Sequence, residues 1–262
     1  MDDRYIGVFD SGLGGITVLN ELIKELPDEK FIFLADTLRS PYGEKTKKEL
    51  YDIVYRNIDT LISRGVKLIV FACNTVSSLD LTIIRRKYDL PIITVLEATL
   101  EEVKSSDKKI LVAATEATIK SGKHKSLINE RYPDIYVEGV ACNDIVPAIE
   151  GDNLEFIDTQ NIVDSYIYEY SSCGFDTLIL GCTHYPILQA EFECALPKAK
   201  IINPAYKTAF LTKNYLEKHN MLGSEGFSDS REDLYLVTKD EDVFKKKMQE
   251  IFSISPEKVE KI

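Results

Sequence analysis

The 262-residue chain lacks features that mark several large classes of protein. It has no run approaching the roughly 18–20 apolar residues that a membrane-spanning helix needs. Positive charge is scarce, because 32 Lys and Arg residues face 43 Asp and Glu residues, for a formal net charge of −11. This balance argues against a nucleic acid or an anionic membrane as a partner. Residues 1–5 contain no basic segment followed by an apolar stretch, so we expect no signal peptide and a cytoplasmic location.

Cysteine is sparse and irregularly spaced. The five cysteines are Cys73, Cys142, Cys173, Cys182 and Cys194, and no C-x-x-C pair occurs. The odd number and the spacing indicate neither a disulfide framework nor a zinc finger. In a reducing cytosol we expect free thiols, most of which are small buried apolar residues. A reactive cysteine must therefore be identified by its sequence context.

Short apolar runs alternate with longer segments of helical periodicity. The expected strands are 5–9, 31–35, 68–72, 91–95, 109–113, 136–141, 177–180 and 200–202. The expected helices are 14–26, 45–63, 76–87, 120–130, 157–171, 186–195 and 208–219. Continuously apolar strands that alternate with helices are typical of parallel sheets buried on both faces. Because about eight strands are too many for one small sheet, we predict an α/β fold with two doubly wound, pseudo-symmetric domains.

We place the domain boundaries by the same pattern. The N-terminal domain is expected to contain residues 1–97 and about 207–262, and the C-terminal domain residues 98–206. The segment from about residue 223 onward is charged and weakly patterned. We expect it to form a surface helix over 242–252 and to fold back on the first domain.

Two segments, 65–75 and 174–184, repeat one pattern. Each has a glycine, an apolar strand, a small residue, a cysteine and a polar pair, followed by a helical segment. Cys73 and Cys182 should therefore lie at the carboxyl ends of parallel strands, where open α/β sheets have their active sites. The backbone N–H groups after each cysteine are expected to bind a carboxylate and to lower the pKa of the thiol.

The repeat indicates an internal duplication with one thiol in each half and an active site in the cleft between the halves. One thiolate could remove a proton from a carbon acid while the other thiol returns a proton to the opposite face, which inverts the centre. A thiol pKa of about 8.5 makes both protonation states accessible. One alternative is that both cysteines are structural, since burial is their commonest fate. Another is zinc binding by Cys182 and His184, for which two ligands are too few, so we expect no metal site.

Other segments offer weaker signals. Residues 10–15 contain glycines that permit close approach to a ligand, but the GxGxxG order of nucleotide-binding loops is absent. Asp10 could orient or deprotonate a thiol, although Asp10 and Ser11 also suit a helix N-cap. The turn at 40–44 could direct N–H groups and the phenol of Tyr42 at a carboxylate, or be a simple turn. Glu150 ends a short expected helix and by itself suggests only a surface carboxylate.

Four motifs, 9–15, 41–45, 72–75 and 181–186, occur in the order and spacing of one family. From about residue 5 to 220 the chain resembles the cofactor-independent Asp/Glu racemases, and among them the glutamate racemases. The resemblance implies two α/β domains with the active site between them, no cofactor, and interconversion of L- and D-glutamate to supply D-glutamate for peptidoglycan. It also implies a homodimer.

The resemblance further implies roles for individual residues. Cys73 would handle the proton of the D-enantiomer and Cys182 that of the L-enantiomer. Asp10 would support Cys73, and Glu150 and His184 would support Cys182. The implied substrate contacts are Asp10, Ser11, Pro41, Tyr42, Gly43, Asn74, Thr75, Thr115, Thr118, Thr183 and His184.

The chain departs from the family pattern at four places. It has Val76 where an alanine is usual, Ala114 where a glycine is usual and His124 where a tyrosine is common. The family's usual Glu-Pro-Gly turn is replaced by Glu97-Ala98-Thr99. These changes concern the expected hinge and the pocket shape, and they leave both cysteines in place. His124, His219 and the other three cysteines are interpreted as surface or packing residues.

Three rival functions are open. A racemase for aspartate or a hydantoin would use the same mechanism, although the turn at 41–43 and the chain length favour glutamate. A decarboxylase of the same fold would keep only one of the two cysteines. A regulatory protein that only binds a ligand would have no physical need for two thiols with Asp10, Glu150 and His184.

Overall fold

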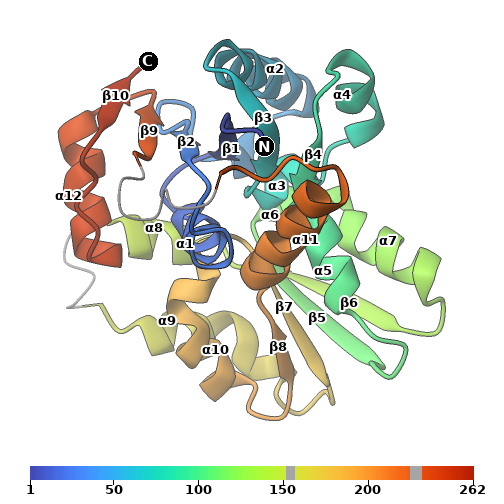
Figure 1. Cartoon of the computed structure of the whole chain (residues 1–262). Coiled ribbons are helices and arrows are strands. Elements are labelled where there is room, and N and C mark those ends of the chain that lie inside the picture. Colours follow the sequence, from blue (N-terminus) through green and yellow to red (C-terminus); the bar gives the residue numbers. More distant parts are fainter. Residues whose placement is uncertain (152–156, 225–231) are drawn as a thin grey trace.

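The computed structural model describes residues 1–151, 157–224 and 232–262 (Figure 1). Strands in these residues form two sheets in which every paired strand runs parallel. The first sheet contains β1 (Tyr5–Asp10), β2 (Phe31–Ala35), β3 (Val66–Phe71), β4 (Ile92–Thr94), β9 (Leu234–Val237) and β10 (Val259–Lys261). The second contains β5 (Lys109–Ala114), β6 (Tyr136–Ala141), β7 (Thr177–Gly181) and β8 (Lys200–Ile202). The predicted α/β class with two parallel sheets is confirmed.

The two sheets share one topology. The first has the order β10-β9-β2-β1-β3-β4 and the second the order β6-β5-β7-β8. Without the two C-terminal strands, the first sheet has the same arrangement as the second, with β1 matching β5 and β3 matching β7. The sequence repeat around the two cysteines is therefore a repeat of structure, because each cysteine follows the third strand of its half.

Helices cover these sheets (Figure 1). In the first 103 residues they are α1 (Ile16–Glu25), α2 (Lys47–Ser63), α3 (Asn74–Ser77), α4 (Leu81–Lys87) and α5 (Val95–Glu102). Further along the described chain they are α6 (Glu116–Ser121), α7 (Lys123–Arg131), α8 (Ile145–Glu150), α9 (Thr159–Ile167), α10 (Gln189–Ala195), α11 (Pro204–Lys218) and α12 (Glu241–Phe252). Short 3₁₀ segments lie at Tyr42–Glu44, Tyr168–Tyr170 and Tyr185–Leu188. None of the helices in the described ranges is both long and apolar enough to cross a membrane.

Two predicted helices are interrupted. The helix expected over 76–87 is split into α3 and α4, because the Asp80 side chain accepts the N–H of Thr82 at 3.0 Å and caps α4. The helix expected over 120–130 begins earlier and is broken at Gly122, whose φ of +66° ends α6. Helix α5 and strands β9 and β10 were not predicted, since their apolar runs are short.

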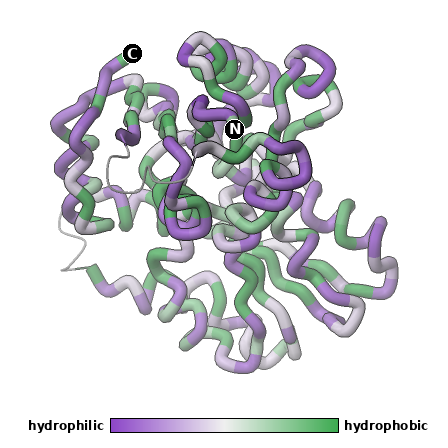
Figure 2. Tube along the Cα trace, viewed as in Figure 1, coloured by the Kyte–Doolittle hydropathy of each residue, from purple (hydrophilic) through white to green (hydrophobic). Residues whose placement is uncertain are grey.

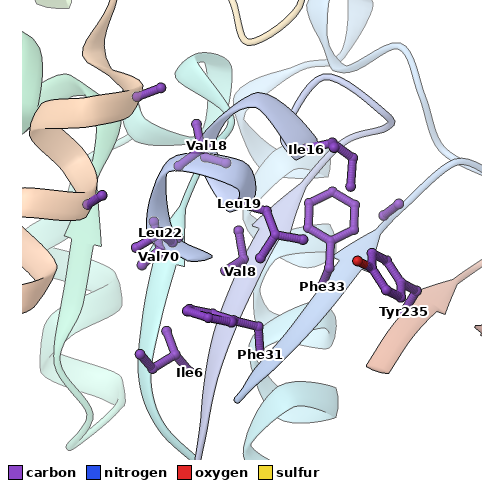
Figure 3. Close-up of a cluster of buried hydrophobic side chains, with 14 of the residues drawn as sticks. Ile6, Val8, Ile16, Val18, Leu19, Leu22, Phe31, Phe33, Val70 and Tyr235 are labelled. Carbon is purple, nitrogen blue, oxygen red and sulfur yellow. The ribbon is translucent and has the colours of Figure 1, made fainter. Parts of the chain in front are cut away.

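Side chains alternate between the faces of the first sheet. Along β1, Ile6 and Val8 belong to one buried cluster and Phe9 to another. Figure 3 shows Leu19 and Leu22 of α1 over the first of these faces. Helix α2 covers the opposite face. Burial on both faces explains why the strands read as continuous apolar runs, and Figure 2 shows hydrophobic colour concentrated along them.

The C-terminal segment folds back on the first sheet, as expected. Strand β9 pairs with β2, and β10 pairs with β9. The helix expected over 242–252 is α12, whose N-cap Asp240 accepts the N–H groups of Asp242 and Val243. It is more than a surface helix, because Phe244 and Met248 are buried in the core of the first sheet. The domain boundaries at about residues 97 and 207 stay a prediction.

The buried ion pair of Lys67 and Glu29 holds the N-terminus and the segment after α11 against the first sheet. Lys67, at the start of β3, has no exposed side-chain surface, and its Nζ lies 2.6 Å from Oε2 of Glu29. The same ammonium donates to the carbonyl oxygens of Asp2 at 2.6 Å and Met221 at 2.7 Å. The other carboxylate oxygen of Glu29 accepts the N–H of Gly223 at 2.8 Å. The chain after α11 is therefore tied to the N-terminus.

We predict that Glu29→Gln lowers the free energy of unfolding by about 3 kcal/mol, because it leaves the Lys67 ammonium buried without its counter-charge. Urea unfolding followed by circular dichroism measures the change. The matched control is Glu21→Gln, which removes a partner of Lys24 in an exposed ion pair and should cost less than about 1 kcal/mol. Equal losses in the two variants would contradict the prediction.

Candidate active site

Both cysteines of the repeat lie where the sequence placed them. Cys73 follows β3 by two residues and Cys182 directly follows β7, and both are buried. They line one cavity of about 370 Å³ between the carboxyl ends of the two sheets. The other predicted site residues that line it are Ser11, Pro41, Tyr42, Gly43, Asn74, Thr75, Thr115, Glu150, Thr183 and His184. Asp10 and Thr118 lie behind this layer and contact its members.

Asp10 joins the two halves from beneath the cavity. It ends β1, is fully buried, and accepts the N–H of Gly12 at 2.9 Å and the hydroxyl of Thr183 at 3.2 Å. Burial raises its pKa to about 6, against the opposing effects of His184 and the two hydrogen bonds. The alternative of a simple helix cap is wrong for Asp10, because α1 is preceded by Gly15 and has no side-chain cap.

Two glycines allow this close approach. A Cβ atom on Gly14 would collide with the side chains of Thr183 and His184. A Cβ atom on Gly15 would lie 2.5 Å from the Cβ of Asp10. The lack of a side chain at Gly14 therefore permits contact between the halves, and at Gly15 it leaves room for Asp10 beneath the loop.

Cys182, His184 and Glu150 form a line of hydrogen-bonding groups. Nδ1 of His184 lies 3.8 Å from Sγ of Cys182, and its Nε2 lies 2.7 Å from Oε1 of Glu150. Burial lowers the pKa of His184, but the hydrogen bonds to Cys182 and Glu150 outweigh it and hold the pKa well above its ordinary value. For Glu150 burial raises the pKa, but the hydrogen bond and the charge of His184 outweigh it, so that the net shift of the Glu150 pKa is downward. The pair is therefore a carboxylate and an imidazolium.

Cys73 has a different environment. Its Sγ lies 3.8 Å from Oγ of Ser11. Burial and the negative charge of Asp10 raise the pKa of Cys73 to about 12, despite hydrogen bonds from Val76 and Ser11 that lower it. The N–H of Val76 at the start of α3 lowers the pKa of this thiol as expected, but burial and Asp10 outweigh it, so the net shift is upward. Cys73 is therefore a protonated thiol.

Three threonines connect the loop after β3 with the loop after β5. The hydroxyl oxygens of Thr75, Thr115 and Thr118 lie 3.0–3.2 Å from one another. Beside them, the side-chain oxygen and nitrogen of Asn74 are buried and have no hydrogen-bond partner among the described residues. Buried polar atoms are nearly always paired. The Asn74 amide is therefore available to a ligand in the cavity.

The turn at Pro41–Gly43 is held from behind. The hydroxyl of Tyr42 donates to Oδ2 of Asp36 at 2.6 Å, and Asp36 also contacts Arg39 at 2.7 Å and Thr238 at 2.8 Å. Burial and the Asp36 charge raise the pKa of Tyr42. Asp36 therefore accepts the hydrogen bond that this phenol donates. The contact of Tyr42 with a carboxylate ligand stays a prediction.

Some residues of the cavity carried no signal in the sequence. Cys142, which we interpreted as a packing residue, lines the cavity, and so do Thr37, Asn143, Val146 and Pro147. They come from the loops after β2 and β6 and from α8, whose sequences do not resemble the motifs around Cys73 and Cys182. His124 is buried and His219 stacks on Tyr215, as expected for packing residues. The described ranges contain no group of three or more side chains suited to a metal ion.

Comparison with known proteins gives consistent matches. The family model described as Asp/Glu/hydantoin racemase matches residues 29–208. A glutamate racemase of Lactobacillus helveticus is 36% identical over 247 residues, which is 93% of this chain and 91% of that protein. One from Oceanobacillus iheyensis is 35% identical and covers 84% of this chain and 82% of its own length.

Solved structures agree. The fold is similar to that of a Francisella tularensis glutamate racemase in complex with D-glutamate, with a TM-score of 0.92, 29% identity and coverage of 100% of this chain and 98% of that chain. A glutamate racemase isoform of Bacillus anthracis gives a TM-score of 0.93 at 26% identity, with the same coverage. A Picrophilus torridus aspartate racemase has a TM-score of 0.60 at 18% identity and covers 82% of this chain and 94% of that chain, a likeness of fold alone.

We predict that Asp10→Asn stabilises the protein at pH 8. The pKa of Asp10 rises from 3.8 to about 6 on folding, so the free energy of unfolding falls as the pH rises through this interval. Above pH 6 the loss is about 3 kcal/mol. Asparagine keeps the hydrogen-bonding shape without this penalty. Urea unfolding at pH 8 and pH 4 measures the difference, which should shrink at the lower pH. An equal or lower stability of the variant at pH 8 would refute the prediction.

Proposed function

This chain belongs to the Asp/Glu/hydantoin racemase family, and we propose that it is a glutamate racemase that uses Cys73 and Cys182 as its two acid/base groups. The observation that carries the proposal is that the two thiols follow equivalent strands of two equivalent sheets and line one cavity. A substrate held between them would present opposite faces of its α-carbon to the two sulfurs.

The proposed reaction of L-glutamate begins with proton removal by Cys182. Cys182, beside His184, acts as the thiolate and takes the proton from Cα as the S–H bond forms and the C–H bond breaks. Cys73 is a thiol and gives its proton to the opposite face of the carbanion. The product is D-glutamate, with Cys182 protonated and Cys73 a thiolate. Transfer of one proton between the thiols through solvent restores the first state.

The reverse direction requires a thiolate at Cys73. Burial and the charge of Asp10 both oppose it. The α-ammonium group of a bound amino acid would offset the Asp10 charge and so lower the pKa of Cys73. This gives Asp10 its role in the proposal: from beneath the cavity its charge acts on the ammonium group and couples substrate binding to the acidity of Cys73.

Neutral donors are proposed to bind the carboxylates of the substrate. The unpartnered Asn74 amide, the hydroxyls of Ser11, Thr75 and Thr183 and the backbone of the 41–43 turn surround the cavity. Thr115 and Thr118 fix Thr75 from the second half. Donors without charge bind an anion and add no further buried charge to a site that already holds Asp10 and Glu150.

The wider role follows from the relatives rather than from the site. We propose that the enzyme works in the cytoplasm, forms a homodimer and supplies D-glutamate for peptidoglycan. The two sheets support the proposed domains, with residues 1–97 and about 207–262 in one and 98–206 in the other. Aspartate as the main substrate is the alternative, and the relatives at 35–36% identity favour glutamate.

We predict that Cys73→Ala and Cys182→Ala each lower racemization at least about 100-fold, because each removes one of two required proton-transfer groups. Circular dichroism of L-glutamate in D₂O with the purified enzyme follows loss of optical activity, and proton NMR follows deuterium entering at Cα. Cys194→Ala, which changes an exposed cysteine, is the control. Near-wild-type turnover in either site variant would exclude the two-thiol mechanism. Turnover of aspartate but not glutamate by the wild type would identify aspartate as the substrate.

We also predict that prolonged dialysis against EDTA leaves the racemization rate unchanged, since proton transfer between carbon and the two thiols needs no metal. The same circular dichroism assay measures the rate. A loss of activity that zinc restores would instead support the Cys182–His184 metal site.

A further inference from the structure

We propose that Lys247 of α12 is a positioning residue for the hydrogen-bonded groups Glu150, His184 and Cys182. Through Lys247 the C-terminal segment would support the Cys182 side of the active site. The inference rests on the proposed function, because it assigns Lys247 an effect on the Cys182 half of the reaction. Lys247 itself lines no part of the cavity and touches no reacting atom.

The contact lies at the end of α8. Nζ of Lys247 donates to the carbonyl oxygen of Gly151 at 2.7 Å, and the side chain is buried. Gly151 directly follows Glu150, the last residue of α8. Carbonyl groups at a helix C-terminus lack partners within the helix, and a cation there is favourable. Lys247 therefore fixes the backbone from which the Glu150 side chain extends.

The rest of α12 makes this contact rigid. Phe244, three residues before Lys247, and Met248, the next residue, are buried in the core of the first sheet. Ile251 packs against the core of the first sheet and also against that of the second. Figure 1 shows α8 beside α12 at the left of the molecule. The helix is thus anchored in one half and reaches the other half at Glu150.

From Gly151 a short series of contacts leads to the sulfur. The carboxylate of Glu150 accepts from Nε2 of His184 at 2.7 Å, and Nδ1 of the same ring lies 3.8 Å from Sγ of Cys182. The Leu13 N–H also binds Glu150, and the positive charge of Lys247 acts with it to keep the pKa of Glu150 low. Displacement of α8 or loss of this charge would weaken the hold of Glu150 on the imidazolium.

The kinetic test compares three variants of the full-length protein. Lys247→Met keeps the aliphatic length but removes the ammonium, and we expect kcat for L-glutamate to fall about 10- to 100-fold with little change in KM, as for a displaced catalytic group. Lys247→Arg should restore most of the activity. Lys246→Met is the matched control, because it removes the neighbouring lysine of α12, which is exposed and pairs with Glu250 on the same helix. Its kcat should match that of the wild type.

A second measurement does not depend on turnover. The chain has only three histidines, so the imidazole signals of ¹⁵N-labelled protein can be assigned with His184→Gln. The titratable groups facing His184 are Cys182, Glu150 and Asp10, with Lys247 acting through Glu150. Lys247 itself faces Glu250, whose Oε2 lies 3.3 Å from its Nζ. We expect the His184 ring to lose its proton at a lower pH in Lys247→Met than in the wild type or in Lys246→Met.

The outcomes separate the two proposals. A wild-type protein that racemizes glutamate, with Lys247→Met unchanged in both kcat and His184 titration, would overturn the positioning role. The positioning role would also be overturned if Lys247→Arg did not restore the activity and Lys247→Met unfolded at a lower urea concentration than the wild type. That result would show general destabilisation. A wild-type protein without racemase activity but with the expected His184 shift would refute the proposed function and leave the positioning role standing.

Discussion

The close approach of the glycine-rich loop after β1 to the loop after β7 is the contact on which the site depends. Gly14 has no room for a side chain because Thr183 and His184 occupy that space, and Asp10 accepts the Thr183 hydroxyl from the other half. The cavity exists because two sheets with equivalent topology meet at their carboxyl ends. A looser junction would admit water around Asp10 and His184 and would remove the burial that sets their pKa values.

The two thiols have different surroundings, although their sequence settings are alike. At Cys73 burial and the nearby Asp10 both favour the neutral thiol. Beside Cys182 lies the His184–Glu150 pair, with Nδ1 of His184 3.8 Å from the sulfur. A racemase needs one thiol ready to accept a proton and one ready to donate, so this difference suits the proposed chemistry in the direction from L-glutamate.

The C-terminal segment connects the stability of the fold with the site. Residues after α11 are tied under the first sheet through Glu29 and Lys67, continue into β9 beside β2, and return in α12. Thr238, just after β9, binds Asp36, which holds Tyr42 and the turn at the cavity. Lys247 reaches α8 on the other side. Both sides of the cavity are thus supported by the last quarter of the chain, whose sequence is the least patterned.

The sequence by itself determined the α/β class, most of the strands and the placement of Cys73 and Cys182, because apolar runs that end in a cysteine place it at the edge of a parallel sheet. It also indicated that residues 10–15 and 41–45 belong to a site. Only the tertiary structure decided that Asp36 engages the Tyr42 phenol, that Glu150 meets His184 across 34 residues, and that Cys142 lines the cavity. It alone also decided the acidity of Cys73, since a pKa depends on burial and on charges from other elements. Such contacts arise between segments distant in sequence, and local periodicity carries no record of them.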